Sequence, residues 1–349
     1  MRVHFCIPGD ITLPTGGYAY DRRILQGLLA QGVDARHVEL PETYPAPDAA
    51  ALADTLRATS SAESGDVLLI DGLAFGAMPA ELVTVMATGG RHIVALVHHP
   101  LCLEAGITSA DAARLRASER TALALATAVI VSSPMTARTL VTDFDVPPGK
   151  ITVAEPGTDR ALRAPRRGDP PRLLAVGSVV PRKAYGVLVE ALSALIGLPW
   201  RLTIAGAARD AAEFSRVRQV IEGHGLAARI ELLGAVAEER IPGLYAEADI
   251  FVMPSLYEGY GMALAEAMAR GLPIVCTTGG AAAETCPDAA AIKVPPGDVV
   301  AFREALRRVL GNAPLVAAMS DASFAAGHAL PTWDDTVRSI VGALSRIAR

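Results

Sequence analysis

The chain contains few of the residues that mark metal-binding, redox-active or disulfide-rich proteins. Only four cysteines occur in 349 residues, and none forms a Cys-x-x-Cys pair. Two of them, Cys6 and Cys276, lie inside short apolar runs that are typical of buried strands. We interpret the cysteines as small core residues of a protein in a reducing cytoplasm, and we expect neither a disulfide nor a metal site built on them.

Long hydrophobic runs and strong positive charge are also missing. No uncharged apolar stretch reaches the roughly 20 residues of a membrane-spanning helix, so we expect no integral membrane span. Residues 1–8 are predicted to form a short buried strand and not a signal peptide. The formal net charge of −5 implies no basic face, which argues against a nucleic-acid partner. The absence of Gly-x-Ser-x-Gly and Walker sequences argues against hydrolase and P-loop functions.

Hydrophobic residues make up 51% of the chain and aromatic residues only 5%, so Ala, Val and Leu must fill the core. That composition suits helices packed on parallel sheets. In the first part of the chain, short apolar runs alternate with Ala- and Leu-rich amphipathic stretches. We predict strands at 2–7, 67–70, 92–97 and 128–131, and helices at 20–31 and 110–126.

Residues 155–172 interrupt this alternation because they are rich in proline, glycine and charge, which predicts an interdomain linker. A second alternating series follows. It predicts strands at 172–180, 200–205, 229–233, 249–254 and 273–277, and helices at 185–196, 209–223, 241–248, 262–270 and 299–310. The result is an α/β protein with two Rossmann-like domains. A last amphipathic helix is predicted at 331–347, with Thr332 as its N-cap.

The strongest functional signal is a glycine-bearing turn after the strand predicted to end at Pro254. Glu258 lies in this turn, a helix starts near Gly261, and Glu266 lies about one turn into that helix. Ligands of parallel sheets collect at the carboxyl ends of strands, and free amides at a helix start suit a phosphate. Either glutamate alone would be read as a solvated surface carboxylate. Their spacing with the glycines favours ligand contacts from the free amides of Gly261, Met262 and Ala263 and from the Glu266 carboxylate.

A second signal is the turn from Gly177 to Gly186, which again follows a predicted strand and precedes a helix. It carries Ser178 and two adjacent cations, Arg182 and Lys183. Two cations at a carboxyl edge suit a leaving pyrophosphate as negative charge develops on it. The alternative is an ordinary exposed basic turn. The chain has only three lysines, so a lysine at this place favours a functional role over an ordinary basic turn.

Two weaker signals lie in the first domain. Gly16 and Gly17, between the first strand and the first helix, permit close approach of a ligand to the backbone, although a plain tight turn fits equally well. His98 follows the strand predicted at 92–97 and is placed to contact a bound sugar or acceptor. A structural hydrogen-bonding role is the more common use of such a histidine.

At these residues the chain resembles the retaining glycosyltransferases of family 4, which have the GT-B fold. The family's mark is two glutamates separated by seven residues, matched by Glu258 and Glu266. The turn from Gly177 to Lys183 matches the family's donor-phosphate turn, Gly16-Gly17 its N-terminal glycine loop, and His98 a histidine near the sugar. The chain departs from the family at Ser178, where arginine is common, and at Ala184, where glycine is usual.

The resemblance implies two facing domains with a cleft between them. One comprises residues 1–158 plus 331–349 on the acceptor side, the linker is 159–171, and residues 172–330 bind the nucleotide sugar. It also implies transfer of a sugar from a nucleotide-diphosphate sugar, the co-substrate, with retention and without a metal or other cofactor. The catalytic residues would be Arg182, Lys183, Glu258 and His98, and the donor contacts Gly16, Gly17, Ser178, Tyr260, Gly261, Met262 and Glu266.

The acceptor is left open as a small molecule, a glycan or a lipid-linked molecule. Two alternatives to a transferase also stay open: a nucleotide-sugar epimerase of the same fold, and a non-catalytic protein that binds a nucleotide sugar. A nicotinamide dehydrogenase is less favoured, because neither domain carries the Gly-x-Gly-x-x-Gly fingerprint.

Overall fold

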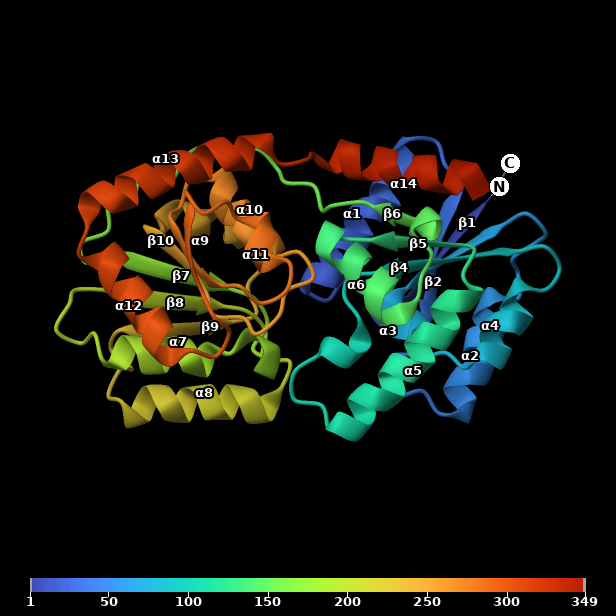
Figure 1. Cartoon of the computed structure of the whole chain (residues 1–349), viewed down its shortest axis with the longest axis horizontal. Helices are drawn as coiled ribbons and strands as arrows, with labels where there is room; N and C mark the ends of the chain where they lie inside the picture. Colours follow the sequence, from blue (N-terminus) through green and yellow to red (C-terminus); the bar gives the residue numbers. More distant parts are fainter. Residues whose placement is uncertain (1, 348–349) are drawn as a thin grey trace. The chain divides into compact units, whose positions relative to one another are not determined.

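The computed structural model describes residues 2–347 and divides the chain into two compact units (Figure 1). The first unit holds the residues up to Leu13, Gly17–Gly157, and those from Pro331 onward. The second unit holds Thr158–Leu330 together with Pro14–Gly16. Each unit is a parallel six-stranded sheet covered by helices, which confirms the predicted α/β class with two Rossmann-like domains. The expected cleft between them stays a prediction.

The sheet of the first unit has the strand order β2-β1-β3-β4-β5-β6, and all its pairs are parallel. Its strands are β1 (Val3–Pro8), β2 (Ala35–Leu40), β3 (Val67–Asp71), β4 (His92–Val97), β5 (Ala128–Val131) and β6 (Ile151–Val153). Its helices are α1 (Gly16–Ala30), α2 (Ala49–Thr59), α3 (Gly72–Phe75), α4 (Ala80–Ala87), α5 (Ser109–Leu125), α6 (Pro134–Phe144) and α14 (Trp333–Ile347), with 3₁₀ turns η1 (Leu101–Leu103) and η2 (Pro148–Lys150).

The sheet of the second unit has the order β12-β11-β10-β7-β8-β9 and is also parallel. Its strands are β7 (Arg172–Val176), β8 (Arg201–Ala205), β9 (Ile230–Gly234), β10 (Ile250–Met253), β11 (Ile274–Thr277) and β12 (Ala291–Val294). Its helices are α7 (Tyr185–Ser193), α8 (Ala211–Gly223), α9 (Ile241–Glu247), α10 (Met262–Ala269), α11 (Ala282–Thr285), α12 (Val299–Leu310) and α13 (Ala313–Ala329), with 3₁₀ turns η3 (Pro181–Lys183) and η4 (Glu238–Arg240).

Successive residues of the central strands enter different cores, which is why these strands are mostly apolar. In β7, Leu173 packs with the residues of α7, α8 and α12, whereas its neighbour Leu174 packs with those of α9 and α10. Figure 1 shows α7 and α8 below this sheet and α10 and α13 above it. The sheet is therefore a buried layer between two layers of helices, and its ligand-binding groups must lie at its edges.

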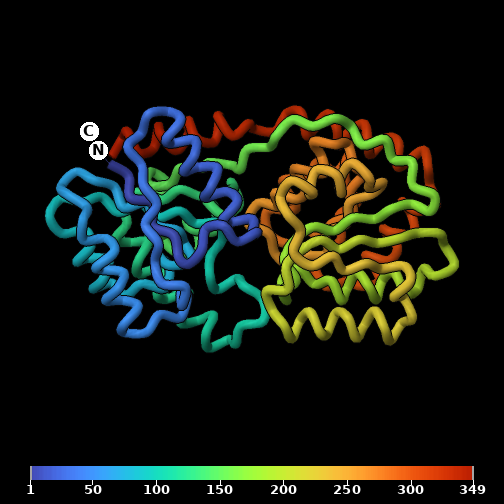
Figure 2. Tube along the Cα trace, turned by 180° about the vertical axis from the view of Figure 1, so that it is seen from behind, coloured from blue at the N-terminus to red at the C-terminus, as the bar shows by residue number. Residues whose placement is uncertain are grey.

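The linker runs along α13 within the second unit, as Figure 2 shows with the linker in green and α13 in red. Arg160 Nη1 donates to Gly327 O at 2.9 Å, and Arg163 Nη2 donates to Ser320 Oγ at 2.7 Å. No helix or strand is formed between Ala154 and Pro171. The arginines that made this segment stand out in the sequence thus include two that fasten it to a helix.

Helix α14 belongs to the first unit and packs on its strands β5 and β6. The predicted cap is confirmed, because Thr332 Oγ1 accepts from the Asp335 amide at 3.3 Å while the Asp335 carboxylate accepts from the Thr332 amide at 2.9 Å. Gly27 of α1 faces Val337 of α14 so closely that a Cβ at residue 27 would overlap the valine side chain. No helix among residues 2–347 is long and apolar enough to cross a membrane.

Several predicted boundaries were wrong. The strand predicted at 172–180 ends at Val176, because Gly177 has a φ of +151° and turns the chain out of the sheet. The helix predicted at 20–31 already begins at Gly16, so Gly16 and Gly17 lie in its first turn and not in a preceding loop. Strands β2, β6 and β12 were not predicted, nor were helices α2, α4, α6 and α13.

We expect Gly327→Ala to destabilise the chain by about 1–3 kcal/mol, because a Cβ there would overlap the carbonyl group of Met268 and push α13 away from α10. Urea denaturation measures this. Gly342→Ala is the matched control, since this helical glycine of α14 has only Arg346 Nη1, at 3.9 Å, near its Cβ position. The control should be neutral or slightly stabilising, by up to about 1 kcal/mol. Equal losses in both variants would contradict the packing argument.

Candidate active site

The order of strands in the second sheet creates a point where chain connections run in opposite directions. From β7 the chain continues to β8 and β9 on one side, whereas β10, β11 and β12 extend on the other. The loops after β7 and β10 therefore leave the same carboxyl edge from neighbouring strands. Open α/β sheets bind their ligands at such a switch point. Both strong sequence signals, one after β7 and one after β10, are brought together there.

Three kinds of contact join the two loops. Lys183 Nζ lies 2.6 Å from Glu258 Oε1, and Arg182 Nη1 lies 3.5 Å from the same oxygen. Arg182 Nη1 also donates to Tyr257 O at 2.6 Å, and the Leu256 amide donates to Arg182 O at 2.8 Å. Side chains predicted to act together from separate motifs thus form one cluster.

This cluster is mostly buried and carries a net positive charge. Glu258 is 6% exposed, and the side chains of Arg182 and Lys183 are 16% and 13% exposed. Burial by itself would raise the pKa of Glu258, but the charges of Lys183 and Arg182 outweigh it and lower the pKa to about 2. Glu258 is therefore ionised at neutral pH, and two cations face one carboxylate. Such an arrangement is suited to an anionic ligand that arrives with further negative charge.

Glycines let the loop after β7 pack against neighbouring backbone. A Cβ at Gly177 would come 2.9 Å from Lys183 Cε, and Gly177 O accepts from the Tyr185 hydroxyl at 2.8 Å. Gly206, which follows β8, lies so close that a Cβ there would overlap Gly177 O and come 2.9 Å from the Ser178 amide nitrogen. Gly206 was not predicted to be part of the site. A glycine directly after an apolar strand was its only signal.

Ala184, one of the two departures from the family pattern, keeps a backbone conformation that is typical of glycine. It has a φ of +48°, a left-handed conformation that glycine adopts at lower cost. It lies between η3, which ends with Lys183, and α7. The backbone thus keeps the conformation of a glycine here, although the residue is alanine.

The loop after β10 ends at Gly261, whose φ of +94° allows the sharp entry into α10. The first amides of α10, beginning with Met262, have no partner within the helix and are placed to bind a phosphate. Tyr260 is 6% exposed, and its carbonyl oxygen accepts from Thr285 Oγ1 at 2.6 Å. Glu266, in the second turn of α10, is half-buried. Burial raises its pKa, and Tyr245 and Arg270 oppose that rise.

A second pair of glycines fixes the backbone of Glu258. Glu258 N donates to Gly279 O at 3.2 Å, and Ala281 N donates to Glu258 O at 2.8 Å. A Cβ at Gly280 would overlap the carbonyl oxygen of Glu258. Gly279 and Gly280 were not predicted to be part of the site, although both follow a predicted strand.

In the first unit, the weak signals lie at the carboxyl edge of β1 and β4. Arg22 Nη1 donates to Ile11 O at 2.7 Å and to Leu13 O at 3.2 Å, which shapes the loop before α1. A Cβ at Gly17 would lie 3.5 Å from His98 Cδ2, in ordinary contact. Gly17 and His98 are therefore neighbours, whereas a Cβ at Gly16 would meet nothing within 4 Å.

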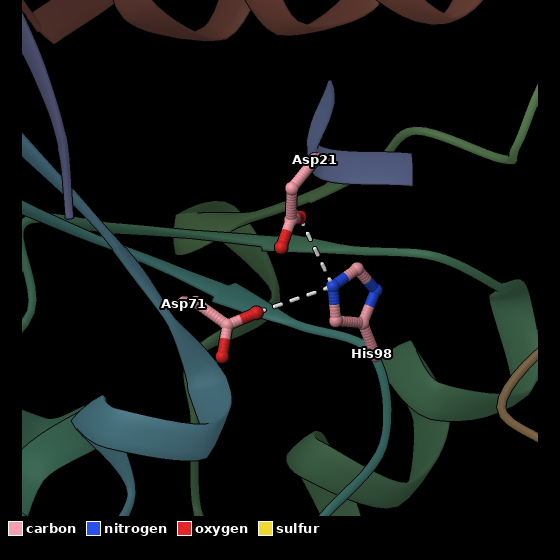
Figure 3. Close-up of side chains that lie close together, drawn as sticks. All are labelled: Asp21, Asp71 and His98. Atoms are coloured by element: carbon pink, nitrogen blue, oxygen red, sulfur yellow. Dashed lines mark hydrogen bonds and ion pairs between the residues drawn. The ribbon is translucent and has the colours of Figure 1, made fainter. Parts of the chain in front are cut away.

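His98 is held by two aspartates that the sequence analysis missed. Figure 3 shows its Nε2 between the carboxylates of Asp21 and Asp71. The distances are 3.2 Å to Asp21 Oδ1 and 3.3 Å to Asp71 Oδ2. Asp71 ends β3, so an acidic residue directly after a predicted strand was a usable signal. Asp21 is fully buried in α1, and nothing in the sequence distinguished it from a surface carboxylate.

These three residues are the group among residues 2–347 whose potential ligand atoms come close enough, within 4.8 Å, to hold a metal ion. In the structure His98 Nε2 forms an ion pair with each of the two carboxylates. The chain also contains one Asp-x-Asp sequence, Asp143-Phe144-Asp145. Its carboxylates pair with Arg116 and Arg120, so it shows no sign of a metal site.

Comparisons with known proteins match both units to glycosyltransferases. Residues 4–157 match the model of a glycosyl transferase 4-like domain, and residues 170–312 match the model of glycosyl transferases group 1. The chain is 29% identical over 250 residues to the MMP alpha-(1->4)-mannosyltransferase of Mycolicibacterium hassiacum, a match that covers 65% of this chain and 58% of that protein. The chain thus spans little more than half the length of this relative.

Solved structures show the same fold at lower sequence identity. The sucrose-phosphate synthase of Thermosynechococcus elongatus superposes with a TM-score of 0.83 at 20% identity, and covers 99% of this chain and 98% of its own. Anabaena HepE in complex with UDP-glucose gives a TM-score of 0.76 at 17% identity, with 98% and 99% covered. Because the two family models together account for most of the sequence, the chain belongs to the group 1 glycosyltransferases of the family 4 type.

Proposed function

We propose that this chain is a retaining, metal-independent glycosyltransferase that moves a sugar from a nucleotide-diphosphate sugar to a hydroxyl acceptor in the cytoplasm. The observation that carries the proposal is the cluster of Arg182, Lys183 and Glu258 at the switch point of the second sheet. Support comes from the family models, from the mannosyltransferase relative, and from the UDP-glucose in the complex of HepE.

The donor would lie along the loops after β7 and β10. Its diphosphate would meet Arg182, Lys183 and the first amides of α10, since these groups supply positive charge and unpaired N–H donors. The ribose hydroxyls would donate to the Glu266 carboxylate, and Glu258 would accept from hydroxyls of the sugar. Ser178 and Tyr260 border this path. No metal is required in this scheme, because the two cations do the work of charge neutralisation.

Transfer breaks the bond from the sugar C1 to the diphosphate oxygen and forms a bond from C1 to the acceptor oxygen on the same face. The bonding electrons go to the departing diphosphate, whose growing charge Lys183 and Arg182 stabilise. The acceptor hydroxyl gives its proton to an oxygen of that diphosphate. The products are a nucleoside diphosphate and a glycoside with the configuration of the donor. The acceptor, a small molecule, a glycan or a lipid-linked molecule, would be held by the first unit near Gly16, Gly17 and His98.

Calorimetric titration with UDP, GDP and ADP, without metal, tests the donor site. We expect one nucleotide to bind well, and Glu266→Ala to weaken its binding about 10- to 100-fold through loss of the ribose contact. Glu222→Ala is the matched control, because Glu222 is an exposed glutamate of the same unit that pairs with Arg218. Absence of binding by all three nucleotides to the folded protein would refute the donor-site assignment.

The same preparation separates a transferase from its alternatives. Conversion of the donor sugar without any acceptor would favour an epimerase, and tight binding without turnover over an acceptor panel would favour a binding protein. A transferase of the proposed kind requires an acceptor and gives a product whose anomeric configuration, measured by NMR, equals that of the donor.

A further inference from the structure

Two histidines of the first unit are buried beside aspartates, yet their surroundings differ. His4 Nε2 lies 3.0 Å from Asp66 Oδ2, and its Nδ1 receives hydrogen bonds from Arg36 Nε at 3.1 Å and Arg36 Nη2 at 2.8 Å. A ring nitrogen that accepts from a guanidinium has no proton of its own. His4 is therefore a neutral ring, with its single proton on Nε2 toward Asp66.

His98 has the opposite environment. Its Nε2 lies between two carboxylates, Asp21 at 3.2 Å and Asp71 at 3.3 Å, which requires a proton on Nε2. The other groups placed against it are the ring edge of Tyr20 from α1, at 5.2 Å between centroids, and Ser132 from the end of β5, whose Oγ donates to His98 O at 2.9 Å. None of these neighbours is a cation, so no positive charge comparable to that of Arg36 disfavours the protonated form of this ring.

The carboxylates are fixed in place by their own surroundings. Asp21 is fully buried, and its Oδ2 has no hydrogen-bond partner among residues 2–347. Asp71 Oδ1 accepts from the Leu73 amide at 2.8 Å, the N-cap contact of α3, which leaves its Oδ2 for His98. Burial disfavours the charged imidazole, but Asp21 and Asp71 outweigh that effect and raise the pKa of His98 well above its usual range. The raised pKa and the two ion pairs both favour the doubly protonated ring.

The second nitrogen of His98, Nδ1, points away from both carboxylates (Figure 3). No partner for it lies among residues 2–347, and the side chain is 22% exposed. A doubly protonated His98 has no lone pair with which to act as a base. It offers one charged N–H donor in a fixed direction, at the carboxyl edge where β1, β3 and β4 are neighbours in the sheet.

We propose that Asp21 and Asp71 are positioning residues that hold His98 as an imidazolium, so that its Nδ1–H donates to a hydroxyl oxygen of the transferred sugar or of the acceptor. The chemistry favours a neutral hydroxyl over a phosphate, because two carboxylates accompany the one positive charge and leave the cluster without net positive charge. This inference rests on the proposed function for the identity of the ligand, whereas the cluster of His98 with Asp21 and Asp71 does not depend on it.

The protonation is tested on the whole chain by NMR of protein labelled with ¹⁵N at histidine, recorded from about pH 6 to about pH 9, a range that spans ordinary histidine titration. Loss of one signal in His98→Gln assigns the ring. We expect both nitrogens of His98 to remain protonated throughout the wild-type series, whereas His4 shows one unprotonated nitrogen. In Asp71→Asn, which keeps an acceptor for the Leu73 amide, the midpoint of His98 should fall into the measured range. Asp21→Asn provides a second variant if Asp71→Asn does not fold.

The kinetic arm separates a positioning role from a purely structural one. In the wild type, His98 is not expected to titrate over this pH range, so it should cause no change in kcat with pH. In Asp71→Asn, kcat should fall as the pH rises through the new midpoint, by about tenfold or more, since a charged hydrogen bond is then lost. Asp66→Asn, which removes the carboxylate beside His4, is the matched control and should keep the wild-type profile.

Three results would overturn the proposal. The first is a wild-type His98 with an unprotonated nitrogen at neutral pH. The second is an Asp71→Asn protein whose ring titrates while its kcat profile stays unchanged. The third is a divalent cation that the purified chain retains and Asp71→Asn loses, because a metal at Nε2 requires loss of that proton. Absence of any nucleotide binding or transfer would instead refute the proposed function and His98's sugar contact, while the NMR series would still decide the protonation of the ring.

Discussion

Replacing Lys183 by alanine is expected to lower kcat for sugar transfer about 10²-fold or more. The Lys183 ammonium is the cation closest to Glu258, at 2.6 Å, and lies at the carboxyl edge where the diphosphate is proposed to bind. Negative charge on the leaving diphosphate is greater in the transition state than in the bound donor. The loss should therefore fall on kcat more than on KM. Steady-state kinetics at saturating donor measure it.

Two companion variants make this result interpretable. Lys293→Ala removes another lysine of the same unit, whose Nζ donates to Ala283 O at 2.7 Å and pairs with Asp288, and it should leave kcat unchanged. Lys183→Arg keeps the charge beside Glu258 and should recover part of the lost activity. Thermal melting of each variant shows that it is folded under the assay conditions. A folded Lys183→Ala protein with the kcat of the wild type would exclude any part for this ammonium in stabilising the leaving group.

The central strands could be predicted from the sequence because they are apolar on both faces. Every residue of β1, β3 and β10 is buried, and all except His4 in β1 and Asp71 at the end of β3 are apolar. The edge strand β2 could not be recognised in the same way. Its residues Arg36 to Glu39 are at least partly exposed, since only one neighbouring strand pairs with it, and the resulting polar pattern resembles a loop.

Helix α13 was missed for a different reason. Many of its contacts with the rest of the second unit are made by small and polar residues, beside the buried Met319. Ser320 Oγ donates to Gly271 O at 2.6 Å, Ser323 Oγ donates to Leu272 O at 2.7 Å, and Gly327 lies against Met268. A helix that packs through hydroxyls and a glycine carries little of the hydrophobic periodicity on which sequence analysis depends.

Some residues of the candidate site could likewise be predicted from the sequence and others could not. Glu258 and Glu266 lie in one continuous motif, so their proximity could be predicted from spacing. The ion pair of Glu258 with Lys183 joins residues far apart in the chain, and only the placement of β7 next to β10 brings them together. Asp21 gave no signal, because a carboxylate inside an amphipathic helix is usually solvated. Its role follows from the packing of α1 beside the ends of β3 and β4.

Replacing Glu258 by glutamine is expected to lower both activity and stability, and the stability loss should depend on pH. In the wild type the pKa of Glu258 is held at about 2 by Lys183 and Arg182 against the effect of burial. In the unfolded chain the pKa of this carboxyl group is about 4.3. The lowered pKa in the folded chain therefore stabilises the fold fully at pH values above about 4.3, and this stabilisation is lost as the pH falls from there through the pKa of the folded chain. The shift corresponds to roughly 3 kcal/mol at neutral pH, an upper figure because the glutamine amide still accepts from Lys183.

Urea denaturation of the wild type and of Glu258→Gln at several pH values between about 7 and about 3 tests this. The wild type should be the more stable protein at neutral pH, and the difference should shrink as the pH falls below about 4.3. There the unfolded chain binds a proton at residue 258, whereas the folded chain, with its pKa at about 2, stays ionised. Glu304→Gln is the matched control, because Glu304 pairs with Arg307 on an exposed helix surface, where solvent screens the pair. A difference between wild type and Glu258→Gln that stays constant with pH would mean that Lys183 and Arg182 do not hold the charge of Glu258, and the electrostatic basis of the proposed donor site would fail with it.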